Sequence, residues 1–327
     1  MIDPWLAPFP IPQTAVGTTL LNPFEETLLP LGDWIEIGVE WLVDNFRWIF
    51  QAIRWPINSL LTQVENLFQV IPPLIFLTIV GLIAWQLAGR RIALLSLGCL
   101  TLVGLIGAWE ESMTTLALVI TAVVLCIVVG LPLGIWAASD DRAEAFLRPV
   151  LDAMQTLPAF VYLVPVVMLF GTGQVPGVIV TFIFAVPPLI RLTNIGIRQV
   201  PADVVEAARA FGSTPQQILW DVEIPLALPT ILAGVNQALM LALSMVVIAS
   251  LIAVEGLGQM VNRGIGRLDV GLASVGGIGI VLIAIMLDRI TQAVGQPGAT
   301  PDTWLNQGPI GGIRSLLRSS PLKAPSK

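Results

Sequence analysis

Seven apolar stretches, each about the length of a membrane-spanning helix, constrain the fold of this chain more than any other feature. None has a charged residue near its middle, and they cover residues 70–88, 91–109, 113–137, 153–170, 175–193, 229–252 and 272–290. A helix needs about 20 mainly apolar residues to cross the hydrocarbon core of a bilayer. The composition agrees, because 55% of the 327 residues are hydrophobic and only 12% are charged, against about 25% charged in an average soluble domain. The sequence therefore predicts an all-α, polytopic membrane protein.

A different pattern precedes the first span, between residues 33 and 58. Four tryptophans recur at seven-residue intervals, and a polar stripe runs beside them through Glu36, Glu40, Asp44, Arg47, Gln51 and Arg54. These spacings are typical of an amphipathic helix. We expect it to lie in the headgroup layer with its indole rings as anchors, although packing on the protein's own outer surface also explains the pattern. Residues 1–32 are rich in Pro and Thr, so residues 1–69 are expected to form an extracytoplasmic tail and an interfacial helix.

The distribution of Lys and Arg sets the expected orientation, because these residues collect in cytoplasmic loops. With the N-terminus outside, twelve of the 16 cations lie inside, and the four outside are Arg47, Arg54, Arg263 and Arg267. The reverse orientation inverts this ratio. We therefore predict a protein of the plasma (inner) membrane with its N-terminus outside and its C-terminus in the cytoplasm.

Several kinds of chemistry are excluded by what the chain lacks. It has no histidine, and its only lysines are Lys323 and Lys327, so imidazole catalysis and a lysine-containing phosphate-binding loop are both excluded. Cys99 and Cys126 lie within apolar stretches and are expected to be packing residues rather than a disulfide or a metal site. A net charge of −6 offers no basic surface for nucleic acid. The spans also lack the central Asp, Glu or His of many proton- and ion-coupled carriers. We therefore expect no catalytic residue here and an energy supply from another protein.

The loop over residues 194–228 is the most informative segment. It is too polar to insert into the membrane, and it carries too many helix signals to be an unstructured linker. Pro201 suits the first turn of a helix, and Gly212 suits the left-handed turn that ends one. Thr214-Pro215-Gln216-Gln217 then offers an N-cap, a proline at the first helical position and a capping-box glutamine. We predict a helix–glycine–helix projection into the cytoplasm. On these residues alone, a hairpin that merely connects two spans is the alternative.

The order of residues in this loop resembles the EAA loop of ABC importer permeases. Glu206-Ala207-Ala208 is followed after three residues by Gly212 and after nine more by Val222-Glu223-Ile224-Pro225, where the family form is E-A-A-x3-G-x9-I-x-L-P. The resemblance implies that the loop docks on a cytoplasmic ATPase subunit. Glu206 would make polar contacts there, Ala207 and Ala208 would allow close approach, and Gly212 would make the turn. ATP would be bound by that partner, and this chain would need no cofactor of its own.

Further stretches are similar to the permeases of glycine betaine/proline ABC importers and extend the resemblance from about residue 20 to 295. They are Asn22–Phe24, Leu29–Trp34, Asp152–Pro165, Gln199–Asp203, Ala233–Leu251, Gly264–Asp269 and Asp288–Gln292. The resemblance implies a five-helix, MetI-like permease core over residues 113–293, two accessory spans within 70–112 and a cytoplasmic tail over 294–327. It also implies a homodimer, an ATPase under each copy and an extracytoplasmic binding protein that delivers an osmoprotective solute. Glu255 departs from the family pattern, in which we expect glycine.

Polar residues within the spans are candidates for the translocation path. They are Gln155, Thr156 and Tyr162 in the fourth span and Asn236, Gln237, Ser244 and Ser250 in the sixth. Pore lining and hydrogen bonding between helices use the same residue types, and both interpretations stay open. The spans show no aromatic cage of the kind that binds a quaternary ammonium tightly, so we expect the separate binding protein to select the solute. An ABC permease for another small polar solute is the alternative function. An ion-coupled carrier is less favoured, because we find no repeat of broken helices.

Overall fold

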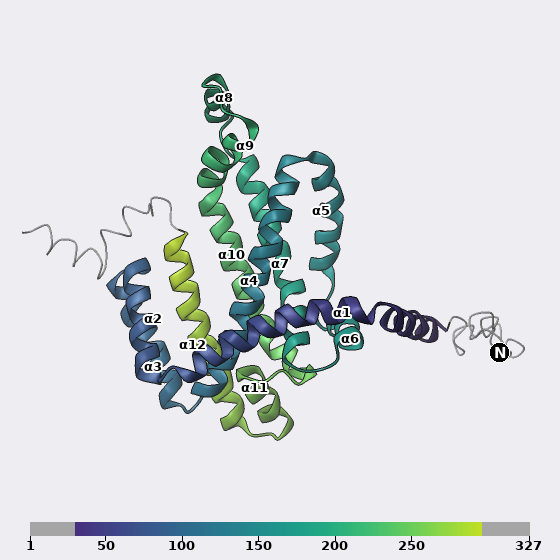
Figure 1. Ribbon diagram of the computed structural model, residues 1–327. Helices are drawn as coiled ribbons and strands as arrows, with labels where there is room; N and C mark the ends of the chain where they lie inside the picture. Colours follow the sequence, from purple (N-terminus) through teal and green to yellow (C-terminus); the bar gives the residue numbers. More distant parts are fainter. Residues whose placement is uncertain (1–29, 296–327) are drawn as a thin grey trace, which may run out of the picture. The chain divides into compact units, whose positions relative to one another are not determined.

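The computed structural model describes residues 30–295, and every regular element within them is helical (Figure 1). The predicted all-α fold is confirmed. Most of the predicted N-terminal tail and most of the predicted C-terminal tail lie outside the described residues. The chain divides into two units, residues 1–51 and residues 52–327, which are treated separately below. Helix α1 (Leu31–Val70) begins in the first unit and ends in the second.

The described part of the first unit is the N-terminal half of α1. Asp33 lies in its first turn, where a carboxylate interacts favourably with the helix dipole. The side chains of Trp34, Trp41 and Trp48 are exposed. Phe46 has non-helical backbone angles (φ −117°, ψ 16°), which mark a kink. The helix predicted over 33–58 is therefore present but extends to Val70, and its place in the headgroup layer stays a prediction.

The second unit continues with a series of helices that the figure labels along the chain. They are α2 (Pro73–Ala88), α3 (Arg90–Leu105), α4 (Trp109–Ser139), α5 (Asp141–Thr156), α6 (Ala159–Phe170), α7 (Gln174–Arg198), α8 (Ala202–Ala210), α9 (Pro215–Gln217), the π-helix η2 (Ile218–Glu223), α10 (Ile224–Ala249), the 3₁₀ turn η3 (Ser250–Ile252), α11 (Leu257–Gly266) and α12 (Val270–Val294). Helices α9, η2, α10 and η3 follow one another without a break, from Pro215 to Ile252.

The core of this unit forms where α4, α7 and α10 pack against one another. Its buried side chains include Leu116, Val119, Cys126, Val178, Leu189, Leu243 and Met245. Gly134 permits the close approach of α4 to α7, because a Cβ atom there would lie 2.5 Å from the Cβ of Thr193. Both cysteines are buried and unbridged, as expected of packing residues.

The number of spans differs from the prediction of seven. Four described helices are long and apolar enough to cross a membrane, and two bent pairs, α1 with α2 and α5 with α6, bring the number to at most six. The stretch 91–109 ends as a helix at Leu105, where Gly107 (φ +74°) turns the chain into α4. At 16 residues, α3 is shorter than a usual spanning helix.

The predicted span over 153–170 is not one helix. It breaks between Thr156 and Ala159, and α5 and α6 meet there at 103°. Leu157 is extended (φ −71°, ψ 133°) because a residue before proline is disfavoured in the helical region, and Pro158 follows it. The apolar pattern continues through the break, so hydrophobicity alone did not reveal it.

Candidate functional site

The loop between α7 and α10 projects beyond the ends of those helices (Figure 1). Its first helix, α8, has no buried residue. Pro201 is the N-cap of α8 rather than a residue of its first turn. Asp203 lies in the first turn and Arg209 in the last, so both charges favour the helix dipole.

Gly212 ends α8 in the predicted left-handed conformation. Its φ is +85°, and nothing lies within 4 Å of where a Cβ atom would be. The N–H of Phe211 donates to the carbonyl of Ala207 at 3.1 Å, and that of Ser213 donates to the carbonyl of Ala208 at 3.1 Å. These bonds satisfy the last carbonyls of the helix. A side chain would have room here, so steric crowding does not explain the glycine. The left-handed backbone conformation favours it instead.

The predicted capping box is also present. The Thr214 hydroxyl accepts from the Gln217 N–H at 3.4 Å, and the Gln217 side chain accepts from the Thr214 N–H at 2.8 Å. Pro215 occupies the first helical position. The second helix of the loop is not separate, because α9 passes through η2 into α10. A displacement of this part of the loop therefore acts directly on a long spanning helix.

The outer side of the loop carries apolar side chains without cover in the described chain. Phe211 is 91% exposed and Trp220 62% exposed. Glu206 and Ala207 are exposed, and Ala208 is half-buried. On its inner side, a hollow of about 630 Å³ lies between the loop and the ends of α4 and α7, and Glu206 and Arg209 are among its lining residues. The arrangement offers a small apolar tip flanked by charges.

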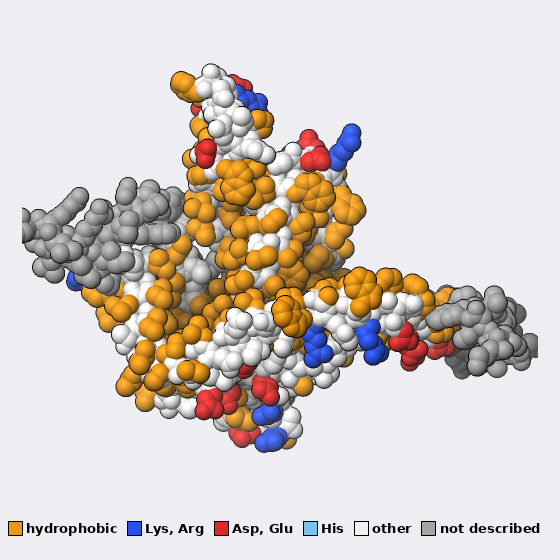
Figure 2. All heavy atoms as spheres, viewed as in Figure 1, with side chains coloured by type: hydrophobic (Ala, Val, Ile, Leu, Met, Phe, Trp, Pro, Cys, Tyr) orange, Lys and Arg blue, Asp and Glu red, His pale blue; other side chains and the backbone are white. Residues whose placement is uncertain are grey.

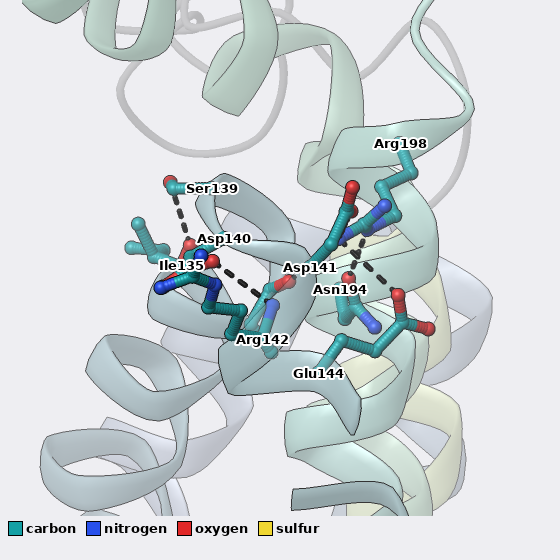
Figure 3. Close-up of polar contacts among 9 residues, drawn as sticks. Ile135, Ser139, Asp140, Asp141, Arg142, Glu144, Asn194 and Arg198 are labelled. Atoms are coloured by element: carbon teal, nitrogen blue, oxygen red, sulfur yellow. Dashed lines mark hydrogen bonds and ion pairs between the residues drawn. The ribbon is translucent and has the colours of Figure 1, made fainter. Parts of the chain in front are cut away.

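Arg198, the last residue of α7, anchors the base of this loop (Figure 3). Its guanidinium contacts the carboxylates of Asp141 at 2.8 Å and Glu144 at 3.2 Å. It also donates to the carbonyl of Ala137 and to the side chain of Asn194, each at 2.9 Å. One side chain thus ties the end of α7 to the end of α4 and the start of α5. This cluster is named the Arg198 clasp below.

Local structure places the acidic residues of the clasp. Asp140 caps α5 by accepting from the Arg142 N–H at 2.9 Å (Figure 3), which sets Asp141 and Glu144 in the first turn of α5. A second ion pair joins Arg191 of α7 to Asp152 of α5 at 2.6 Å. The sequence predicted neither this ion pair nor the Arg198 clasp. The acidic first turn of α5 was the available signal, but nothing in the sequence paired it with Arg198.

The candidate path residues Asn236 and Tyr162 take part in contacts between helices. The amide of Asn236 donates to Asp288 of α12 at 3.2 Å, and Thr291 of α12 donates to its carbonyl oxygen. The Tyr162 hydroxyl donates to the carbonyl of Met154, across the break between α5 and α6. The Tyr162 ring packs edge-on to that of Phe184, with centroids 6.4 Å apart. For both residues, these contacts favour the interhelical interpretation over pore lining.

The other candidates separate into exposed and buried positions. Ser250 is buried and donates to the carbonyl of Val247 at 2.6 Å. Gln155, Thr156, Gln237 and Ser244 are exposed, and the hydroxyls of Thr156 and Ser244 donate to carbonyls of their own helices. The structure therefore does not gather the seven candidates into one site. Within residues 30–295 no group of three or more Cys, Asp or Glu is placed to hold a metal ion.

The end of the bundle opposite the loop carries a smaller polar hollow of about 340 Å³. Glu110, Glu111, Glu255 and Arg263 line it. Gly256 has a φ of +117°, and a Cβ atom there would lie 2.5 Å from the Thr115 hydroxyl. That hydroxyl accepts from the Leu257 N–H at 2.9 Å, so the Glu255 turn is held closely against α4.

Comparisons with known proteins agree with this architecture. Residues 130–296 match the family described as "Binding-protein-dependent transport system inner membrane component". The chain is 56% identical over 309 residues to the "Glycine betaine/proline betaine transport system permease protein ProW" of Escherichia coli K12, covering 94% of this chain and 87% of that protein. It is 45% identical over 266 residues to the "Glycine betaine transport system permease protein OpuAB" of Bacillus subtilis 168, covering 81% and 94% respectively.

A solved structure shares the fold. An inward-facing conformation of the MetNI methionine ABC transporter matches with a TM-score of 0.52 and 21% identity, over 57% of this chain and 95% of that chain. At that identity the likeness concerns the fold of the membrane helices alone.

Proposed function

Because this chain belongs to the family of binding-protein-dependent transport system inner-membrane components, we propose that it is the permease subunit of an ATP-driven importer of glycine betaine, proline betaine and similar compatible solutes. The identity of 56% over 94% of the chain to a protein named for glycine betaine/proline betaine transport carries the choice of substrate. Accumulating such solutes protects a cell against osmotic stress. The subunit itself catalyses no reaction.

The proposed docking site for the cytoplasmic ATPase is the loop with Glu206, Ala207, Ala208 and Gly212. Its support is the unburied helix α8 with the exposed Phe211 beyond it, because exposed apolar groups on a small projection are typical of a protein interface. The partner binds ATP, and this chain holds no cofactor. The charge of Glu206 lies beside the apolar tip, where it favours a partner with a complementary cation.

Energy would pass from the loop to the spans by two routes. The α9–η2–α10 continuity joins the second half of the loop to one span, and the Arg198 clasp joins the root of the first half to α4, α5 and α7. A push on the loop therefore displaces several core helices together. Together with the Arg191–Asp152 pair, the clasp keeps α7 and α5 from moving independently.

The subunit is proposed to act as a homodimer with its loop in the cytoplasm. Apart from the charged side chains along α1, Figure 2 shows mainly hydrophobic side chains over the visible side of the bundle between its ends and charged side chains toward the ends. Gln237 and Ser244 are exposed on α10 between those ends. Polar side chains within a membrane usually face a protein neighbour or a water-filled path, so this face of α10 suits the second copy or the path between the copies. The extracytoplasmic binding protein would dock at the opposite end, beside Glu255.

Uptake of labelled glycine betaine tests the proposed substrate. Cells that lack their own betaine importers should accumulate it when this chain is expressed with its ATPase and its binding protein, and excess unlabelled proline betaine should compete. Unlabelled methionine is the matched control competitor and should have no effect. Competition by methionine but not by proline betaine would contradict the proposed substrate class.

A further inference from the structure

An apolar groove of about 570 Å³ runs along the hairpin of α2 and α3, outside the parts used for coupling. Its walls include Leu74, Leu77, Leu82 and Trp85 of α2 and Leu94 and Leu97 of α3. The one hydroxyl in the lining, that of Thr78, donates to the carbonyl of Leu74 at 2.8 Å. The rims are open, with Leu74 78% exposed and Leu94 70% exposed. The groove therefore offers almost only hydrocarbon contacts.

The length of the groove fits a single lipid chain. Its lining on α2 extends from Leu74 to Trp85, which at 1.5 Å per residue is about 17 Å. One leaflet accounts for about half of the roughly 30 Å hydrocarbon core. Gly81 lets Leu97 of α3 pack closely on α2 and form the floor of the groove, because a Cβ atom there would lie 2.9 Å from Leu97 Cδ2.

The mouth of the groove is cationic. Arg90 lines it and lies over the Trp85 ring, with its Cζ 5.3 Å from the ring centroid. Among the described residues, neither Arg90 nor the adjacent Arg91 forms an ion pair with a carboxylate. Helix α3 begins at the same place, and its N-cap, Gly89, offers no side-chain acceptor to the first N–H groups. Free N–H groups and the positive helix end favour an anion.

The mouth also lies at the end of the bundle where an anionic headgroup is expected. The turn between α2 and α3 lies toward the same end of the bundle as the coupling loop and the C-terminal end of α12 (Figure 1). Under the proposed function, this is the cytoplasmic end, where anionic lipid headgroups attract cationic side chains.

We propose that this groove binds an anionic phospholipid, with one acyl chain between α2 and α3 and its phosphate at Arg90 and the start of α3. The cation at the mouth selects the headgroup, and the apolar walls hold the chain. The orientation part of the argument rests on the proposed function, but the binding itself is measured without transport.

The test is competitive lipid retention by the full chain. The purified, delipidated protein is mixed with equal amounts of phosphatidylglycerol and phosphatidylcholine, and retained lipids are counted by native mass spectrometry. Phosphatidylglycerol should be retained preferentially. Arg90→Gln should lower that preference about fivefold, as expected for the loss of about 1 kcal/mol from one arginine, whereas the matched control Arg91→Gln should keep most of it. Equal retention of both lipids, or equal effects of the two variants, would overturn the proposal.

A second measurement locates the lipid. Brominated phosphatidylglycerol should quench a fluorescence component that is present in the wild type and absent from Trp85→Phe, and it should do so at a lower mole fraction than brominated phosphatidylcholine. If the quenching does not depend on Trp85, the retained lipid lies elsewhere and the groove assignment is wrong. Failure of solute uptake would not alter either readout.

Discussion

At the residue scale, Arg198 joins three helices because its planar guanidinium contacts four acceptors at once. No sequence motif predicted these contacts, since the carboxylate partners of Arg198 lie more than 50 positions earlier in the chain. By contrast, the Gly212 turn and the Thr214–Gln217 capping box were predictable, because each depends on residues within one turn of helix. Turns and helix caps can be predicted from a few neighbouring residues, whereas ion pairs between distant helices cannot.

Replacing Arg198 by Gln should weaken the coupling of α7 to α5 near the loop, where among the described residues only the Arg191–Asp152 pair farther along the two helices then joins them by charge. The side chain is about a third exposed, so solvent screening limits the loss of stability to about 1 kcal/mol, and the protein should still insert and bind its ATPase. Transport should fall more than ATPase binding does. Arg142→Gln is the matched control, because the Asp140 cap uses the Arg142 backbone N–H. The ratio of solute transported to ATP hydrolysed measures the effect, and an unchanged ratio in Arg198→Gln would contradict the role of the clasp.

Substitutions at Gly212 can show whether the loop needs the left-handed backbone of this residue or its small size. Its left-handed backbone costs an ordinary L-residue roughly 1–2 kcal/mol, but the space around it is open. Gly212→Val should abolish docking of the ATPase, while Gly212→Asn should retain most of it, since Asn tolerates this conformation. Co-purification of the ATPase with each variant is the measurement. Equal docking by both variants would show that the turn is not needed.

At the element scale, long apolar stretches predicted the helices α4, α7, α10 and α12 but not the interruptions between shorter ones. The break at Leu157–Pro158 was signalled by a proline inside an apolar run, which a span can also tolerate. The short length of α3 depends on the turn at Gly107. The hydrophobicity of a stretch reflects the free energy of moving it from water into the bilayer. It therefore does not distinguish one straight helix from two helices that meet at an angle.

The bond across the α5–α6 break supports a prediction about Tyr162. Tyr162→Phe removes the bond to the Met154 carbonyl and should lower stability by about 1 kcal/mol. The packing against Phe184 is kept, so the concentration of loaded binding protein that gives half-maximal transport should not change. A thermal unfolding series and a transport titration give the two quantities. A large change in the titration with unaltered stability would favour a place for Tyr162 on the path instead.

At the scale of the whole molecule, the fold and family could be anticipated because apolar runs, cation placement and the loop spacing agreed. The proposed homodimer could not be derived in the same way, since large apolar side chains are exposed on many of the described helices and do not single out one face for a second copy. The expected orientation can be tested with single cysteines in a background without Cys99 and Cys126. A cysteine at the exposed Asn58 should react with an impermeant thiol reagent on intact cells, and one at the exposed Gln216 should react only after permeabilisation. The opposite pattern would reverse the topology and place the loop outside.

The most direct measurement of the central claim, that this subunit transmits energy supplied by a partner, is accumulation of labelled glycine betaine in proteoliposomes. With this chain alone, an imposed proton or sodium gradient should drive no accumulation. With the ATPase, internal ATP and external binding protein added, the solute should accumulate against its gradient. Gradient-driven accumulation by the chain alone, without ATPase or ATP, would contradict the account.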